Sequence, residues 1–300
     1  MFERETLHGA YFALAAYLFW GFAPVYFKAI DQVSPLEIVS LRVVWSLLLL
    51  LAILWYMGRF DTLHLPRKDW WKILLSSALL SGNWLTFIYA VVNDNIVAAS
   101  LGYFINPLVS VLLGMVFLNE RLRPLQWIAV AIAAMGIGYQ LMFYGQIPWI
   151  ALVLAFSFGF YGLTRKRLGL HAVGGLALET MVICPAALAW LAWIAWTGEL
   201  QFTRVGIGTD VLLALSGFVT SFPLLCFAAS VRRLSLTAAG MFQYIAPSMS
   251  LIIAVTMYHE AFGISRLITF SCIWLALAIF TFESLYHHNR LHRQSVRQAV

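Results

Sequence analysis

The sequence has little charge, few cysteines and no alternating strand pattern. Only 11% of its 300 residues are charged, 62% are hydrophobic, and the mean hydropathy is +0.85. Soluble domains carry about 25% charged residues, so a soluble globular class is excluded. A transmembrane β-barrel would need segments of alternating polarity, which are missing. The chain is therefore predicted to be an all-α integral membrane protein.

Motifs of common catalytic sites are also missing. There is no HExxH, GxSxG, Walker A or metal-spaced His/Cys pattern, and His287 and His288 stand in a polar tail. The three cysteines, Cys184, Cys226 and Cys272, share no CxxC spacing and are interpreted as small buried hydrophobes. We predict no enzyme, no cofactor and no metal site. Without a nucleotide motif, an ATP-driven pump is not expected.

Ten stretches are long and apolar enough to cross a membrane, which takes about 20 residues of helix. They are residues 9–27, 36–57, 71–92, 98–118, 125–143, 148–164, 173–196, 210–230, 237–258 and 265–286. Five lie in each half, and no long polar segment remains for a soluble domain. The first stretch is interpreted as a retained span, because its leader, with Glu3, Arg4 and Glu5, lacks the clean positive charge of a signal peptide.

Lys and Arg fall almost entirely on one side of this arrangement. With a cytoplasmic N-terminus, that side holds Arg4, Arg59, Arg67, Lys68, Lys72, Arg121, Arg123, Arg165, Lys166, Arg167, Arg232, Arg233, Arg290, Arg293 and Arg297. The other side holds Lys28, Arg204 and Arg266. Positive loops stay in the cytoplasm, so both termini are predicted there. The net charge of +6 thus reflects topology, and nucleic acid is not a predicted partner. The basic tail, residues 287–300, is predicted to be disordered, with contact to anionic lipid as the alternative.

An internal repeat relates the two halves. Residues 81–120 and 221–260 match at ten of forty positions without a gap. The matches are Ser81/Ser221, Leu85/Leu225, Phe87/Phe227, Val91/Val231, Ala98/Ala238, Ala99/Ala239, Ile105/Ile245, Pro107/Pro247, Ser110/Ser250 and Glu120/Glu260. Five spans per repeat would invert the second copy, the architecture of many secondary transporters. We predict repeats at 1–146 and 147–286, followed by the tail.

The matched prolines predict where the helices are interrupted. Pro107 and Pro247 each lack an N–H and displace a carbonyl four residues earlier, that of Tyr103 or Gln243. Pro24 is the corresponding helix-break candidate in the first span. Freed carbonyls in a membrane need a partner or a water-lined space.

Polar faces accompany these prolines and predict a central substrate cavity. The candidates are Tyr17, Trp20, Asn83, Trp84, Tyr103, Asn106, Ser110, Gln243, Tyr244 and Ser250. For Asn106, Ser110 or Ser250 singly, a hydrogen bond or close packing between helices is an equal alternative. For Tyr17, Trp20 or Trp84 singly, packing in the core is the more common explanation. As a set, the faces favour the cavity.

Glu37, Arg42 and Glu179 are charged residues within or near the predicted spans, and such residues are functional candidates. Arg42 could also extend to the outer surface. Glu37 and Arg42 are poorly placed to pair with each other, so partners on other helices are expected. Glu179 could couple proton entry to substrate exit, or it could form a structural ion pair. Glu120 and Glu260, at helix ends, are interpreted as gate or cap residues.

Four segments together resemble one family of membrane proteins. They are LAAYLFWGFAPVYFK from Leu14, GNWLTFIYAV from Gly82, ASLGYFINPLVSVLLGMVFLNERL from Ala99 and FQYIAP from Phe242. These resemble the RarD group of EamA-type transporters in the drug/metabolite transporter superfamily. The resemblance implies a ten-helix bacterial inner-membrane carrier of two inverted EamA repeats, with a central cavity lined by the first, third and fourth helices of each half.

The leading hypothesis is therefore a secondary exporter of small amphipathic metabolites, amino acids or drugs, working by alternating access, with proton coupling as an open alternative. Its predicted partners are a small-molecule substrate and membrane lipids. A lipid flippase or a scaffold without transport is the second hypothesis. The substrate, the coupling ion, the direction of transport and the oligomeric state are not predicted.

Overall fold

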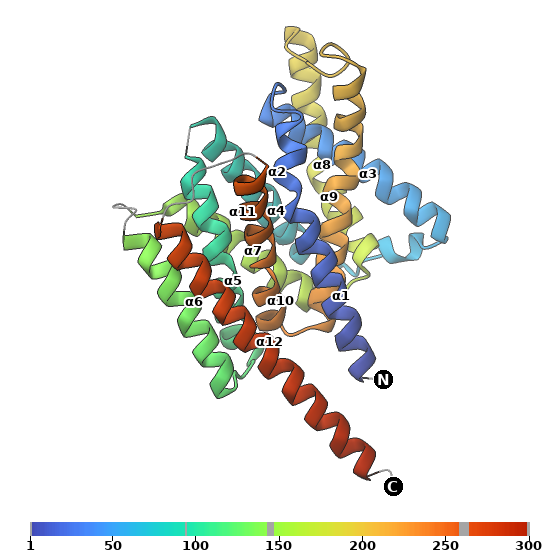
Figure 1. Ribbon diagram of the computed structural model, residues 1–300. Coiled ribbons are helices and arrows are strands. Elements are labelled where there is room, and N and C mark those ends of the chain that lie inside the picture. Colours follow the sequence, from blue (N-terminus) through green and yellow to red (C-terminus); the bar gives the residue numbers. More distant parts are fainter. Residues whose placement is uncertain (1, 94, 143–146, 258–263, 299–300) are drawn as a thin grey trace.

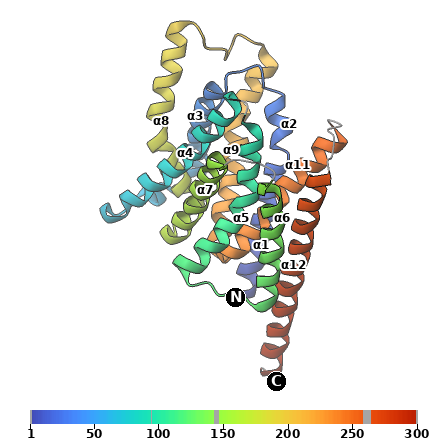
Figure 2. The ribbon, with the colours of Figure 1, turned by 90° about the vertical axis from the view of Figure 1, so that its left-hand side faces the viewer.

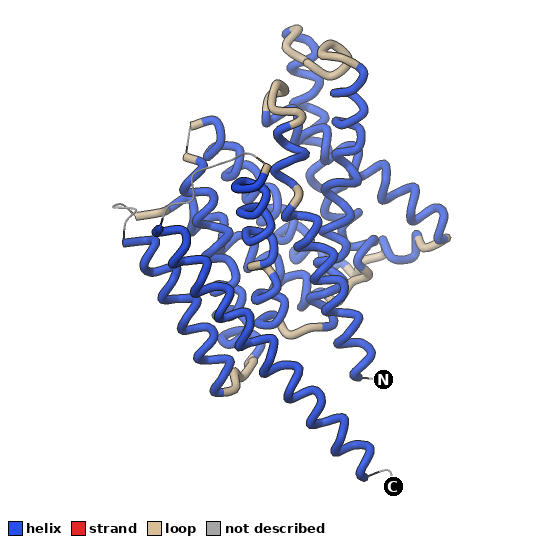
Figure 3. The backbone as a smooth tube through the Cα atoms, viewed as in Figure 1, coloured by secondary structure: helices blue, strands red, loops and turns tan. Residues whose placement is uncertain are grey.

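The computed structural model describes residues 2–93, 95–142, 147–257 and 264–298, and the regular secondary structure in these ranges is helical (Figure 3). The first half consists of α1 (Phe2–Gly21), α2 (Ala23–Lys28), α3 (Pro35–Met57), α4 (Trp70–Val92), α5 (Ile96–Leu118) and α6 (Pro124–Met142). The second half consists of α7 (Trp149–Leu168), α8 (Ala172–Thr197), α9 (Ile207–Arg233), α10 (Leu236–Phe242), α11 (Ile245–Thr256) and α12 (Ile264–Gln298). Two short 3-10 turns, Phe60–Leu63 and Arg67–Asp69, join α3 to α4.

These helices give the ten predicted spans. By length and hydropathy, nine stretches of the described residues could cross a membrane, and α7 is a tenth helix of 20 residues that ends in Arg165, Lys166 and Arg167. The first span is α1 with α2, and the ninth is α10 with α11. The prediction of a disordered tail was wrong, because α12 continues to Gln298. Neither glycine nor proline occurs between Ile264 and Gln298 to end that helix.

Two of the three proline predictions coincide with interruptions. The first span is interrupted at Phe22, and Pro24 stands in the first turn of α2. The ninth span is interrupted at Gln243 and Tyr244, before Pro247 in the first turn of α11. The break predicted at Pro107 was wrong, because α5 continues through it. A membrane helix tolerates proline where neighbouring groups compensate for the lost hydrogen bond.

The second half is inverted relative to the first. Figures 1 and 2 show α1 beginning and α12 finishing at the same end of the bundle, called the terminal end below. Helix α7 is the equivalent of α1, but it ends rather than begins at the terminal end. Near the end of α7, Lys166 donates to the Val231 carbonyl of α9 over 2.9 Å, and Arg233 of α9 contacts Glu5 near the start of α1. Likewise α5 finishes where α10 begins.

Packing follows the same two-fold relation. Helix α1 packs against α9 as α7 packs against α4, and α5 packs against α7 as α11 packs against α1. Equivalent helices also meet directly in the pairs α3 with α8, α5 with α10, and α6 with α12, the last at one edge of the bundle (Figures 1 and 2). The main contacts are thus made between the halves.

Helices α9 and α3 cross closely at Gly217. A Cβ there would stand 2.4 Å from the carbonyl carbon of Trp45, and Ser46 donates to the Gly217 carbonyl over 3.2 Å. We expect Gly217→Ala to lower the free energy of unfolding by about 1–3 kcal/mol, because the helices must separate. Gly138→Ala in α6, where nothing lies within 4 Å, is the matched control. Equal thermal unfolding of the two variants would contradict the crossing.

Candidate functional site

Helices α5 and α10, which belong to equivalent spans of the two repeats, cross at Ser110 and Gly240. A Cβ on Gly240 would lie 2.7 Å from the Ser110 Cβ and 3.1 Å from the Pro107 carbonyl oxygen. Beside this contact, the Gln243 Nε2 donates to the Ser110 hydroxyl over 3.1 Å. Glycine at residue 240 therefore permits a close, polar crossing of two equivalent spans.

Several predicted cavity residues surround this crossing with polar atoms that have no partner. Tyr17, Asn106, Gln243 and Tyr244 are all buried. The Asn106 Oδ1 and the Tyr244 hydroxyl accept or donate no hydrogen bond among the described residues, and the Tyr17 hydroxyl lies near enough to the Gln243 side chain to interact with it. Buried polar atoms without partners are rare, and each calls for a water, a ligand or a second arrangement of the chain. The crossing thus holds unused hydrogen-bonding capacity.

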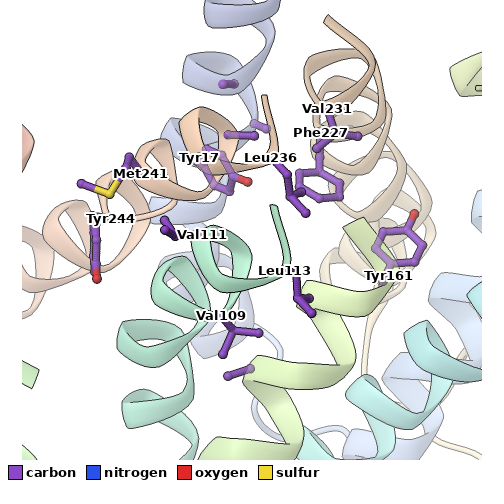
Figure 4. Close-up of a cluster of buried hydrophobic side chains, with 14 of the residues drawn as sticks. Tyr17, Val109, Val111, Leu113, Tyr161, Phe227, Val231, Leu236, Met241 and Tyr244 are labelled. Atoms are coloured by element: carbon purple, nitrogen blue, oxygen red, sulfur yellow. The ribbon is translucent and has the colours of Figure 1, made fainter. Parts of the chain in front are cut away.

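Toward the terminal end the bundle is closed by apolar side chains. Figure 4 shows Tyr17, Phe227, Tyr161 and Leu236 pointing toward one another from α1, α9, α7 and α10. The Tyr161 and Phe227 rings stack with their centroids 5.9 Å apart, and the Tyr17 ring meets Phe227 edge-on at 6.4 Å. Four helices are therefore held together between the crossing and the terminal end.

Polar contacts reinforce this closure. The Glu120 carboxylate, just beyond α5, accepts from the backbone N–H groups of Leu236 and Thr237 over 2.6 and 2.8 Å. It thereby caps the first turn of α10, as predicted for a cap residue, and an anion at a helix N-terminus is favourable. Its repeat partner Glu260 lies outside the described residues.

Arg42 occupies a different environment, away from the terminal end. Its Nε donates to the Thr220 hydroxyl of α9 over 2.9 Å, and its guanidinium lies 4.7 Å from the Trp84 ring of α4 and 5.7 Å from the Phe27 ring of α2. Tyr103 of α5, near enough to interact with its charge, is 51% exposed. Arg42 therefore points between helices of both halves.

The two carboxylates of the predicted coupling set are both held by donors. Glu37 accepts from the backbone N–H of Phe202 over 2.7 Å and from that of Gln201 over 3.0 Å, in the loop after α8. Glu179 accepts from the Tyr161 hydroxyl over 3.2 Å and lies 3.4 Å from Arg165, and Ser76 donates to it as well. These are the contacts that the structural alternative for each residue requires.

Other predicted residues join helices rather than line a common space. Asn83 donates to the Leu154 carbonyl and to Ser157 of α7 over 3.0 and 2.9 Å. Ser250 donates to the Gly21 carbonyl at the break of the first span over 3.3 Å. Trp20 packs edge-on against Phe158, with centroids 5.8 Å apart. The predicted residues thus divide into the crossing group, the surroundings of Arg42 and these contacts between helices.

Sequence reasoning missed four residues that matter here: Gly240, Thr220, Phe227 and Lys166. Phe227 stood in the repeat alignment opposite Phe87, and Lys166 stood among the basic residues of the cytoplasmic side, so a signal existed for both. Thr220 and Gly240 had none, because their importance comes from which helices cross.

Comparisons with known proteins agree with this architecture. The model of the EamA-like transporter family matches residues 7–141 and 147–282. An "Uncharacterized transporter" of Vibrio cholerae is 48% identical over 288 residues, covering 94% of this chain and 95% of the relative. "Protein RarD" of Escherichia coli is 44% identical over 293 residues, covering 97% and 99%.

A more distant relative is the "Chloramphenicol-sensitive protein RarD" of Pseudomonas aeruginosa, 31% identical over 307 residues and covering 99% of this chain and 100% of the relative. A solved structure titled "Crystal structure of protein" superposes with a TM-score of 0.72 at 22% identity, covering 93% of this chain and 98% of that chain, and shares the fold. With both repeats matched and relatives aligned along nearly the whole length, the chain belongs to the EamA-like transporter family of multi-pass membrane proteins.

Proposed function

We propose that this chain is a secondary transporter that works by alternating access in a bacterial inner membrane, exporting small amphipathic metabolites, amino acids or drugs. Both termini would lie in the cytoplasm, because the terminal end carries most of the Lys and Arg. The described arrangement would then be closed to the cytoplasm by the apolar cluster and by Glu120.

The observation that carries this proposal is an asymmetry between equivalent helices. On the cytoplasmic side, Gly240 of α10 packs against Ser110 of α5. The inverted counterpart of that contact would bring Ser100 of α5 against Ser250 of α11, but among the described residues α5 packs against α10, and Ser250 donates to the Gly21 carbonyl of α1. Two repeats of one design in unequal arrangements can exchange them, and that exchange would expose the crossing to each side in turn.

A transport assay tests this proposal directly. Liposomes containing the purified protein and empty liposomes are compared across a panel of labelled amino acids, aromatic metabolites and chloramphenicol, a compound suggested by the name of the Pseudomonas relative. For a compound that the wild type moves, we expect Asn106→Ala to reduce transport about tenfold, because a buried acceptor at the crossing is lost.

Asn93→Ala provides the matched control, because Asn93 is exposed just after α4 and its side-chain amide donates to the nearby Tyr89 carbonyl. Equal uptake by empty and protein-containing liposomes for every compound would overturn the proposal. If phospholipid moved in place of the solutes, the flippase alternative would replace it, and if neither moved, the scaffold alternative would.

Glu37 and Glu179 enter this proposal as structural residues. Each carboxylate is already held by fixed donors, Glu37 at the loop after α8 and Glu179 between α4, α7 and α8. If Glu179 coupled protons to transport, Glu179→Gln would change the pH dependence of transport. If Glu179 is structural, the pH dependence stays as in the wild type.

A further inference from the structure

Arg42 is a cation inside the bundle that forms no ion pair with the described residues. It lies about 10 Å along α3 from Pro35, beyond the first two turns of the span. Among the described residues it makes no ion pair, although a charge within a membrane protein normally has one. Glu37 and Glu179 are occupied by the contacts described above.

The guanidinium is held in one orientation with its recognition edge unused. Its Nε is bound to Thr220, and the Trp84 ring lies against it. The two Nη atoms have no hydrogen-bond partner among the described residues. They are not fully buried either, because neither is one of the buried polar atoms without a partner. Arg42 is partly exposed, and no described residue occupies these two donors. Two parallel N–H groups in this geometry match a carboxylate.

Aromatic side chains surround that open edge. Trp84 and Phe27 border the guanidinium, and the half-exposed Tyr103 ring lies 6.3 Å from that of Phe87. These rings belong to α2, α4 and α5, so the Arg42 side chain lies between helices of the bundle. It does not extend to the outer surface, which was the alternative considered from the sequence. A ligand here would meet one positive group and several flat apolar surfaces.

We infer that Arg42 binds the carboxylate of the transported molecule, and that the substrates are organic monoanions with an aromatic or apolar body. This inference rests on the proposed transport function and names the substrate class of that site. The ligand neutralises the Arg42 charge, while Trp84 and Tyr103 contact its apolar part. The same ligand reaches toward Asn106, one helical turn from Tyr103 on α5.

The test compares acids with their neutral amides. Binding of benzoate, phenylacetate, 3-phenylpropionate and indole-3-acetate, each beside its primary amide, is measured by calorimetry and thermal shift on purified protein in a zwitterionic detergent. We expect at least one acid to bind about tenfold or more tightly than its amide, the usual effect of one charge-assisted pair. If every acid binds no better than its amide, the inference is wrong.

Variants assign the preference to one side chain. Arg42→Gln is expected to reduce acid affinity by about tenfold or more and to leave amide affinity unchanged. Arg42→Lys, which keeps the charge without the planar fork, should fall between. Arg59→Gln removes an exposed arginine paired with Asp61 and serves as the matched control. If folded Arg42→Gln still prefers the acid as strongly as the wild type, the assignment is wrong. If Arg42→Gln does not fold, the acid affinity of Arg42→Lys decides: an affinity equal to that of the wild type would contradict the assignment.

Binding and transport are measured separately, so the two conclusions can fail independently. Preferential acid binding without movement into liposomes would support the anion site and contradict the transport function. Equal transport of an acid and its amide would support the transport function and contradict the anion site.

Discussion

Replacing Glu179 with leucine is expected to lower the free energy of unfolding by about 3–5 kcal/mol. The Arg165 and Glu179 side chains are 2% and 0% exposed and 3.4 Å apart, so removing the carboxylate leaves a buried guanidinium without its counter-ion. Tyr161 and Ser76 lose their acceptor at the same time. Thermal and denaturant unfolding of purified protein in detergent would measure the loss.

A double variant separates the ion pair from simple packing. Arg165→Met combined with Glu179→Leu removes both charges, and we expect it to be more stable than Glu179→Leu alone, because no unpaired charge remains. Glu179→Gln keeps the shape and most hydrogen bonds, and its transport should keep the wild-type pH dependence. A changed pH dependence in folded Glu179→Gln would favour proton coupling over the structural role.

Most of the fold could be predicted, because hydrophobic length and charge placement are properties of the chain alone. The ten apolar stretches and the repeat can be identified from the sequence without knowledge of any contact. The course of α12 was not predicted: the polarity of residues 287–300 indicated disorder, but no glycine or proline interrupts the segment and α12 continues to Gln298. Pro107 was misjudged in the same way, because whether proline interrupts a helix depends on neighbours that compensate for the missing bond.

The candidate site was predictable only as a set of residues. Periodicity placed Asn106 and Ser110 on one face of α5, and the repeat placed Gln243 at the equivalent of Tyr103; in the structure Gln243 donates to Ser110. Nothing local indicated that Arg42 would meet Thr220, which stands 178 residues later, or that Asn83 would join α7. Such partners depend on which helices cross, and crossings arise from long-range packing that periodicity does not encode.

The closure of the cytoplasmic side links the crossing to the capping carboxylate. A Cβ on Gly114 would lie 2.6 Å from the Glu120 carboxylate oxygen and 3.0 Å from the Thr237 hydroxyl, so these groups meet where α5 and α10 come closest. Glu120 can cap α10 only while Gly240 allows that approach. A side chain at residue 240 should therefore disturb the α5–α10 crossing and the cap by Glu120 together.

Gly240→Leu is accordingly expected to abolish most transport by preventing closure toward the cytoplasm. Even a Cβ would stand 2.7 Å from Ser110 and 3.1 Å from the Pro107 carbonyl oxygen. Overpacking of this kind costs about 1–3 kcal/mol, which would shift the equilibrium between the two arrangements by roughly 5- to 150-fold. Gly240→Ala should show a smaller shift in the same direction.

The shift can be measured with a cysteine at the closure. Thr237→Cys, placed in a variant lacking Cys184, Cys226 and Cys272, reports whether this buried position reacts with a membrane-impermeant thiol reagent applied from the cytoplasmic side. We expect faster labelling and slower transport with Gly240→Leu, and no change with Gly82→Ala, whose Cβ would meet nothing within 4 Å. Wild-type labelling and transport in folded Gly240→Leu would mean that the α5–α10 crossing is not what closes the cytoplasmic side.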